Sequence, residues 1–199
     1  MSIKNFLYLS LCLMIGACSS PHLTFEKEPV TGSVCCKVCG SYLLAENNRF
    51  IQGQLSLKRC AYANMPDSAE IQGILNINSD GKKVYSFTSE SQIYFLIHQK
   101  AYPLRLLTTF NKPSTYVEHV GSIGILHDYT AVTKILLIPL DVLAKVTEAD
   151  DVSLILEDPT LKDHRQKSSR IVFKFNPKNL NVMREFKTRC IDQKPKMKE

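Results

Sequence analysis

The cysteines are the residues whose type and spacing come closest to a chemical site. Cys36-Lys37-Val38-Cys39 is a C-x-x-C motif, which supports thiol–disulfide exchange when a helix N-terminus lowers the pKa of the first thiol. Gly40-Ser41 follows directly, and no strand–helix unit of that kind is visible. Zinc requires four ligands, usually from two such pairs. Cys60 and a histidine would complete only a loosely spaced set, so we expect no metal and no cofactor.

Cys18 is a second cysteine with a possible chemical role. It follows Ile15-Gly16-Ala17, which end an apolar run that begins at Phe6, after Lys4. The run is too short for a bilayer-spanning helix, which needs about 20 residues, and it fits an export signal. Small residues before a cysteine resemble the lipobox of bacterial lipoproteins. That resemblance implies that residues 1–17 are a signal peptide and that Cys18 is lipidated, with acyl chains such as palmitate. The alternative is an ordinary secretory signal with a chance cysteine.

An exported chain is expected to use its remaining cysteines in disulfides. The candidates are Cys35, Cys36, Cys39, Cys60 and Cys190. Because their number is odd, one thiol is free, joined to a partner or buried. Cys190 lies on the apolar stripe of a predicted helix and therefore faces the body of the domain. A disulfide from Cys190 would join the end of the chain to its start. Its partner would be Cys60, which we favour slightly, or a cysteine of the Cys35–Cys39 group.

Histidines form the next candidate site. His119 and His127 lie eight residues apart on a predicted strand, with Glu118 and Asp128 beside them. An even spacing places both on one face of a strand, where they would suit a catalytic or metal site. A one-residue register shift at a nearby glycine would place the two histidines on opposite faces. We favour the interpretation that both are exposed histidines at strand ends.

Two acidic pairs flank another predicted strand, Asp150-Asp151 before it and Glu157-Asp158 after it. Paired carboxylates bind calcium or perform acid–base catalysis. Acidic residues are also common where strands end, and we favour that interpretation. The chain has no G-x-S-x-G motif, no Walker loop and no dinucleotide-binding glycines. We therefore expect no catalytic residues and a protein that is not an enzyme.

The elements that would position these residues are mainly strands. Alternating or β-branched segments predict them at 50–57, 71–78, 84–88, 92–97, 104–110, 120–126, 132–138, 152–156 and 170–175. Asp80-Gly81 is typical of a hairpin turn. Helices are predicted at 139–149, which opens on Pro139, and at 177–190, which Asn176 can cap. The pattern predicts a mainly β domain, a β-sandwich with two short helices packed on it.

The segment from Cys35 to Phe110 resembles the periplasmic maltose-operon protein family. A Cys-Cys pair precedes a strand, followed by Lys83-Val84-Tyr85-Ser86-Phe87, a strand at 92–97 and Pro103-Leu104-Arg105-Leu106. The family's glycine-rich step between those two strands is replaced here by Thr88-Ser89-Glu90-Ser91. The resemblance implies a non-catalytic, mostly β envelope protein, and we carry over no role in sugar metabolism.

Charge is unevenly distributed along the chain. Residues 162–199 hold twelve Lys/Arg and four Asp/Glu, a net charge of +8. Such a segment can meet anionic lipid headgroups, lipopolysaccharide phosphates or an acidic partner. A solvated basic face is the interpretation that we favour, and we expect no nucleic-acid partner for an exported chain.

These observations predict a lipid-anchored protein of the bacterial cell envelope. We expect a signal peptide at 1–17, a lipidated tether at 18–30, a β-rich globular domain at 31–190 and a basic tail at 191–199. Ser19 is not the aspartate that marks inner-membrane retention in many such lipoproteins, which favours the periplasmic side of the outer membrane. The expected function is a binding or assembly module with an envelope protein partner. The alternatives are a thiol-redox or metal-binding protein that uses Cys36 and Cys39, and a structural link between outer membrane and cell wall.

Overall fold

The computed structural model describes residues 22–27, 33–40, 42–46, 51–61, 69–80, 90–120, 123–158 and 169–193. The predicted signal peptide, Cys18, the predicted strand at 84–88 and the end of the basic tail lie outside the described residues.

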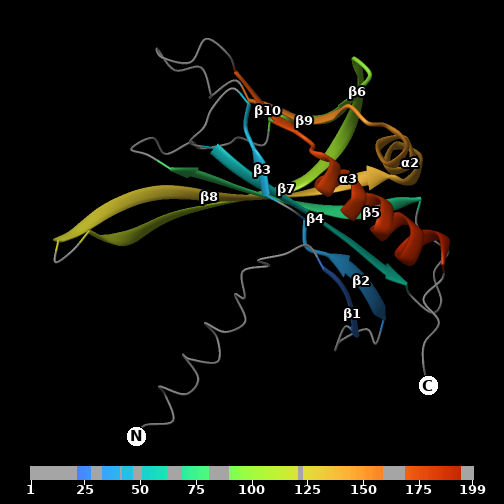
Figure 1. The fold of residues 1–199 in the computed structure, drawn as a ribbon, viewed down its shortest axis with the longest axis horizontal. Helices are drawn as coiled ribbons and strands as arrows, with labels where there is room; N and C mark the ends of the chain where they lie inside the picture. The colour runs from blue at the N-terminus through green and yellow to red at the C-terminus, as the bar shows by residue number, and fades with distance from the viewer. Residues whose placement is uncertain are drawn as a thin grey trace, which may run out of the picture.

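The fold is mainly β, as predicted, but it is not a sandwich. One antiparallel sheet of ten strands curls into a half-barrel, in the order β1-β2-β4-β5-β8-β7-β6-β9-β10, with β3 paired to β4 outside this path (Figure 1). The strands are β1 (Leu23–Lys27), β2 (Val34–Val38), β3 (Tyr42–Leu44), β4 (Ile51–Ala61), β5 (Glu70–Asp80), β6 (Gln92–Ile97), β7 (Lys100–Val120), β8 (Ile123–Pro139), β9 (Val152–Glu157) and β10 (Arg170–Lys174).

The curl brings two distant parts of the sheet together. Ala45, which follows β3, forms an isolated bridge with Phe173 of β10, and the Glu46 N–H donates to the Val172 carbonyl at 2.9 Å. The apolar face of the sheet therefore closes on itself and on the helices. A sandwich would instead cover that face with a second sheet.

Two helices cover the inner face of the curled sheet (Figure 1). α2 (Leu140–Glu148) follows β8 directly, and α3 (Pro177–Phe186) continues into the π-helical turn η2 (Lys187–Asp192). The Asn176 side chain accepts a hydrogen bond from the Asn179 N–H at 2.9 Å, which is the predicted cap. Both helices lie within a few residues of the predicted bounds.

Strand β5 illustrates why these segments form strands. Ile71, Leu75 and Ile77 are buried on the inner face together with Gly73, whereas the alternate residues 72, 74 and 76 are partly exposed. This period of two matches the pleat of a half-buried strand. The core that results gathers residues from β2 to β10 and from both helices.

The β7–β8 hairpin is much longer than the rest of the sheet and projects beyond it (Figure 1). β8 pairs with β5 only as far as Tyr129, opposite Asp80. Beyond that point, residues 115–120 and 123–128 pair with one another. We call this outer part of the hairpin the arm. The sequence predicted a turn at 127–130, but β8 continues through that segment without a break because its pairing with β7 continues there.

Leu23–Lys27, which the sequence placed in the tether, form the edge strand β1 and pair with β2. At the other end of β2 the chain crosses close to β4. A Cβ atom on Gly40 would lie 1.5 Å from the Leu55 carbonyl oxygen, so only glycine fits there. Gln54 secures this crossing by donating from Nε2 to the Gly40 carbonyl at 2.9 Å.

Candidate functional site

Lys134 is the most unusual side chain in the described core. It lies on β8 between buried Val132 and Leu136, on the apolar face of the strand, and its exposed fraction is 0%. Lysine is almost never fully buried without a polar partner. We therefore expect polar hydrogen-bond partners around its ammonium group.

Three polar side chains surround that ammonium group. Lys134 Nζ donates to Ser91 Oγ at 3.0 Å and to Thr109 Oγ1 at 3.2 Å. Ser91 Oγ in turn donates to Asp158 Oδ2. Asp158 is also fully buried, and Ser91 is 7% exposed. They are the residue before β6, a residue in the middle of β7 and the residue after β9. We call them, with Lys134, the Lys134 cluster.

Burial lowers the pKa of Lys134 to about 8, and the negative charge of Asp158 opposes that shift. A lysine beside a serine can act as the base of a Ser–Lys hydrolase. Here, however, Nζ donates to Ser91, and the serine proton is directed at Asp158. The geometry is that of a buried ion pair bridged by a hydroxyl group, which fastens β8 to the ends of β6 and β9.

A second polar cluster joins β6, β9 and β10. Tyr94 Oη donates to Glu157 Oε1 at 2.7 Å, and Arg170 Nε donates to the same oxygen at 2.6 Å. These hydrogen bonds, first that of Tyr94 and then that of Arg170, lower the pKa of Glu157. Burial and the hydrogen bond to Glu157 raise the pKa of Tyr94. Glu157 and Arg170 face each other in the β9–β10 register, so this cluster supports strand pairing.

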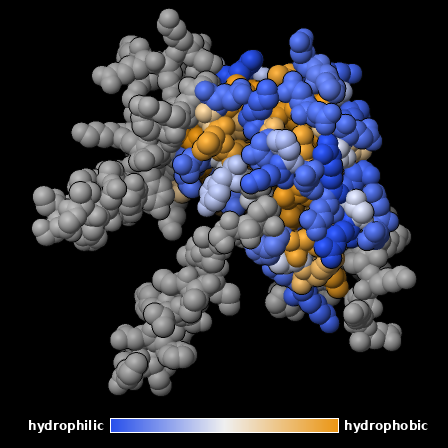
Figure 2. Space-filling view, in the orientation of Figure 1, coloured by the Kyte–Doolittle hydropathy of each residue, from blue (hydrophilic) through white to orange (hydrophobic). Residues whose placement is uncertain are grey.

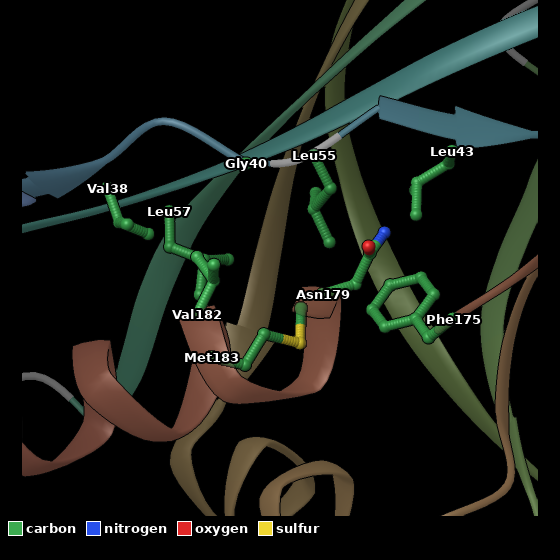
Figure 3. A pocket seen from close by; sticks show the side chains of 9 residues that line it. All are labelled: Val38, Gly40, Leu43, Leu55, Leu57, Phe175, Asn179, Val182 and Met183. Carbon is green, nitrogen blue, oxygen red and sulfur yellow. The ribbon is translucent and has the colours of Figure 1, made fainter. Parts of the chain in front are cut away.

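A pocket lies where α3 packs against β2, β3 and β4 (Figure 3). It is lined by Val38, Gly40, Leu43, Leu55, Leu57, Phe175, Asn179, Val182 and Met183. Asn179 is its one polar side chain among the described residues that line it. Its amide points between Leu43, Leu55 and Phe175.

The amide of Asn179 is incompletely satisfied. Nδ2 donates to the Tyr42 carbonyl at 3.5 Å, the outer limit of a hydrogen bond. Oδ1 is buried, has no hydrogen-bond partner in the described part of the chain, and belongs to a residue that is 5% exposed. An unsatisfied buried acceptor costs about 1–3 kcal/mol, so a donor is expected to be favoured there.

The disulfides differ from the Cys60–Cys190 bond that we slightly favoured from the sequence. Cys36 is bonded to Cys190, and Cys35 is bonded to Cys60, its direct neighbour in the β2–β4 register. The preference for a Cys60–Cys190 bond was wrong, whereas the joining of the chain's end to the Cys35–Cys39 group is confirmed. Cys39 is also disulfide-bonded. The two sulfurs of the C-x-x-C motif are therefore not bonded to each other.

The histidine pair does not lie on one strand. His119 is on β7 opposite Gly124, and His127 is on β8 opposite Tyr116. The even spacing in sequence therefore does not place both side chains on one face of a strand, because a turn lies between them. Along the hairpin the two positions are three register pairs apart. No group of three His, Cys, Asp or Glu residues that could hold a metal occurs among the described residues.

The acidic pairs have different environments. Asp150 and Asp151 are exposed and form ion pairs with Arg184 and Lys174, at 3.4 and 3.5 Å. Glu157 belongs to the second polar cluster, and only Asp158 is buried. Sequence reasoning named Asp158 but missed Lys134, although the alternation of Val132, Lys134 and Leu136 already placed a lysine on an apolar face.

The basic C-terminal segment is partly neutralised where the structure describes it. Arg170, Lys174, Arg184, Lys187 and Arg189 each form an ion pair with a carboxylate. Within the described ranges, neither helix has the length and hydrophobicity needed to span a bilayer.

No protein-family model, no curated protein and no solved structure matches this chain. The lipobox and the likeness to the maltose-operon protein family therefore remain predictions from the sequence.

Proposed function

We propose that this protein is a non-catalytic, lipid-anchored module of the bacterial cell envelope that binds a protein partner through the β7–β8 arm. The arm is the observation that carries the proposal. It extends past Asp80 as two strands, with no third strand beside it among the described residues. A two-stranded hairpin is marginally stable at best in water, so a partner that covers the arm would stabilise it.

The base of the arm offers a contact surface. Leu107 and Phe110 are 52% and 57% exposed, although both are large and apolar. Leu107 occupies the register shift in the β7–β8 pairing, three residues beyond the last residue of β7 that pairs with β6. β6 pairs with β7 only as far as Leu104, so beyond it the outer edge of β7 faces no other described strand. An open strand edge beside apolar side chains suits the addition of a strand from a partner.

The location of the protein in this proposal rests on the sequence. The residues before Cys18 support lipidation, and the Cys35–Cys60 and Cys36–Cys190 disulfides favour an oxidising compartment such as the periplasm. The intact mass of the membrane-extracted protein tests the anchor. A mass that begins at Cys18 with acyl chains supports it, and an unlipidated mass contradicts it.

The exposed edge of β7 that leads into the arm is tested by site-specific crosslinking of the full-length protein in its own envelope. A photoreactive phenylalanine analogue at Phe110 should give a discrete crosslinked product with another protein. The same analogue at exposed Glu148 of α2 is the matched control and should give none. In a second variant, Asn-Gly replaces residues 113–130, which joins Lys112 to its register partner Ala131 through a two-residue turn.

We expect the shortened variant to fold, because the buried core residues that the structure describes all lie in the rest of the domain. It should also lose the partner that the full-length protein captures. Retention of that partner by a folded, shortened variant would contradict a role for the arm.

A further inference from the structure

Strand β1 limits how far the domain can lie from its lipid anchor. The His22 carbonyl accepts a hydrogen bond from the Cys39 N–H at 3.3 Å, and β1 begins at the next residue. A chain spans at most about 3.6 Å per residue, so Cys18 lies no more than about 14 Å from His22. The predicted tether is therefore short, and a lipidated Cys18 would hold this edge of the sheet at the surface of a bilayer.

Strand β3, which lies within reach of the same anchor, exposes large apolar side chains. It begins three residues after Cys39. Tyr42 and Leu44 are 52% and 63% exposed, whereas Leu43 between them is buried. This alternation places Tyr42 and Leu44 on the outer face of the sheet, away from the core. Hydrophobic residues show at the surface around β3 in Figure 2. Tyrosine is enriched where membranes meet water, because its ring is apolar and its hydroxyl group is polar.

Two lysines lie on the same outer face. Lys37 of β2 and Lys58 of β4 face each other in the strand register. Their neighbours Val38 and Leu57 are buried, so both lysines point outward, where they are partly exposed. Exposed Glu26 of β1 lies diagonally across from Lys37, and the three side chains together carry a net positive charge. Like charges that face each other are unfavourable in a sheet, and anionic phosphate groups of lipids would offset this repulsion.

We propose that the outer face of β2, β3 and β4 docks on the membrane that carries the anchor. Tyr42 and Leu44 enter the headgroup region, and Lys37 and Lys58 lie beside the phosphate groups of anionic lipids. The occupant of this surface is a bilayer, because the short segment between Cys18 and His22 keeps one within reach. This inference rests on the lipid anchor of the proposed function, and it uses a surface other than the arm.

Docking through this face also gives the arm a direction. β7 lies four strands from β3 around the curled sheet, through β4, β5 and β8. It also lies four strands away in the other direction, through the Ala45–Phe173 bridge and then β10, β9 and β6. The outer face of β7 is therefore on the side of the sheet opposite to β3. The exposed side chains at the base of the arm, Leu107 and Phe110, would point away from the bilayer.

Tryptophan fluorescence can test this docking, because the chain contains no tryptophan. Tyr42→Trp would be introduced into the full-length, lipidated protein, in vesicles of phosphatidylcholine and phosphatidylglycerol with bromine atoms on the upper part of the acyl chains. Leu107→Trp is the matched control, because Leu107 has the same exposed fraction as Tyr42, 52%. We expect the bromine atoms to quench the fluorescence of Tyr42→Trp, whose emission shifts to shorter wavelengths, and to leave Leu107→Trp unchanged.

Both substitutions are at exposed positions, and circular dichroism would check that each variant is folded. An unquenched, folded Tyr42→Trp variant would overturn the docking surface. Equal quenching of the two variants would overturn it as well, because the protein would then have no preferred face toward the bilayer.

The lysines are tested in the Tyr42→Trp background. Lys37→Gln and Lys58→Gln should each reduce the ratio of docked to undocked protein about fivefold, the factor that one lysine near an anionic surface supplies. Fluorescence lifetimes with and without brominated lipid would measure this ratio. Lys100→Gln, at the exposed start of β7, is the control and should leave the ratio unchanged. An unchanged ratio in both Lys37→Gln and Lys58→Gln would overturn the assignment of an anionic lipid surface.

The two proposals can fail separately. A lipidated protein whose Tyr42→Trp variant is not quenched would retain its anchor and its arm and lose this docking surface. Quenching without a crosslinked product at Phe110 would support the docking surface and contradict the arm. A mass without acyl chains would overturn the anchor together with the docking surface that rests on it.

Discussion

Burial of the Lys134 ammonium group carries a large desolvation cost. An ammonium group without water is tolerated because Ser91 and Thr109 accept its hydrogen bonds and the Asp158 charge lies beyond the serine. Buried pairs of this kind contribute little net stability, but the loss of one member leaves the other charge uncompensated.

We therefore expect Lys134→Met to lower the free energy of unfolding by about 3–5 kcal/mol, measured by urea denaturation with the disulfides intact. Lys145→Met is the matched control, because that lysine forms an exposed ion pair with Asp141 at 3.1 Å. It should change stability by less than about 1 kcal/mol. Similar losses in the two variants would show that the Lys134 cluster does not bear a buried charge.

The depressed pKa of Lys134 also predicts how stability depends on pH. The folded pKa is about 8, below the ordinary value of 10.5, so between these values the unfolded chain binds more protons than the folded one. Stability should therefore rise with pH over this range, by up to about 3 kcal/mol. Above about pH 10 the raised pKa of Tyr94 acts in the opposite direction.

The measurement is a series of urea denaturation curves from about pH 7 to about pH 10, without added thiol. The increase should vanish in Lys134→Met, which has no ammonium group to deprotonate. A flat profile in the unaltered protein would mean that water reaches Lys134 or that its charge is fully compensated.

At the scale of elements, the β6–β7 hairpin has a turn that its residues do not favour. His98 and Gln99 adopt φ angles of 47° and 66°, the left-handed region that asparagine and glycine occupy at low cost. Ile97 and Lys100 pair on either side of them, so the turn has two residues with positive φ.

We expect the double substitution His98→Asn and Gln99→Gly to raise the free energy of unfolding by about 1 kcal/mol, because this sequence is preferred in such turns. Thermal and urea unfolding would measure the change. His98→Pro is the opposite control, because proline cannot adopt a positive φ, and it should destabilise the hairpin. A double variant less stable than the original chain would contradict the assigned turn.

Elements with a strong local signal were predicted well from the sequence. Asn176 and Pro177 gave the start of α3, and alternation gave β5 and the inner part of β8. The arm was missed because His127 and the residues after it look like a turn, whereas pairing with β7 keeps them in a strand. Register with a distant strand is not visible in local composition.

Candidate sites were harder to predict, because each of them brings together residues that lie far apart in the sequence. Alternation placed Lys134 on a buried face, but nothing local pointed to Ser91 or Asp158 as its partners. Asn179 is recognisable as a residue near a helix cap, and only packing against β3 and β4 leaves its oxygen without a donor.

At the scale of the whole molecule, the sandwich prediction was wrong for a comparable reason. Alternation shows that one face of each strand is buried, but it does not show whether that face meets a second sheet or another part of the same sheet. The bridge between Ala45 and Phe173 and the cover supplied by α2 and α3 settle the question in this fold.

The disulfides Cys35–Cys60 and Cys36–Cys190 constrain the chain to different degrees. Cys35–Cys60 spans 25 residues and Cys36–Cys190 spans 154. The chain-entropy model assigns them about 3.5 and about 5 kcal/mol. We expect Cys36→Ser/Cys190→Ser to destabilise the protein by about 1.6 kcal/mol more than Cys35→Ser/Cys60→Ser, measured by urea denaturation without thiol.

Removal of both partners in each variant avoids a new free thiol, so each pair of substitutions serves as the control for the other. The reverse order of stability would mean that local packing around Cys35–Cys60 outweighs the length of the loop that Cys36–Cys190 closes.

Cys35 and Cys36 are adjacent in β2, so they point to opposite faces of the sheet. One is bonded to the neighbouring strand β4 and the other to η2, which lies against the inner face. A slip of β2 by a single residue would exchange the two sulfurs between the faces, and neither native bond could then form. Formation of both disulfides therefore requires the native register of β2. Thiol exchange during oxidative folding can act as proofreading, because a misaligned strand leaves reactive thiols until the alignment is corrected.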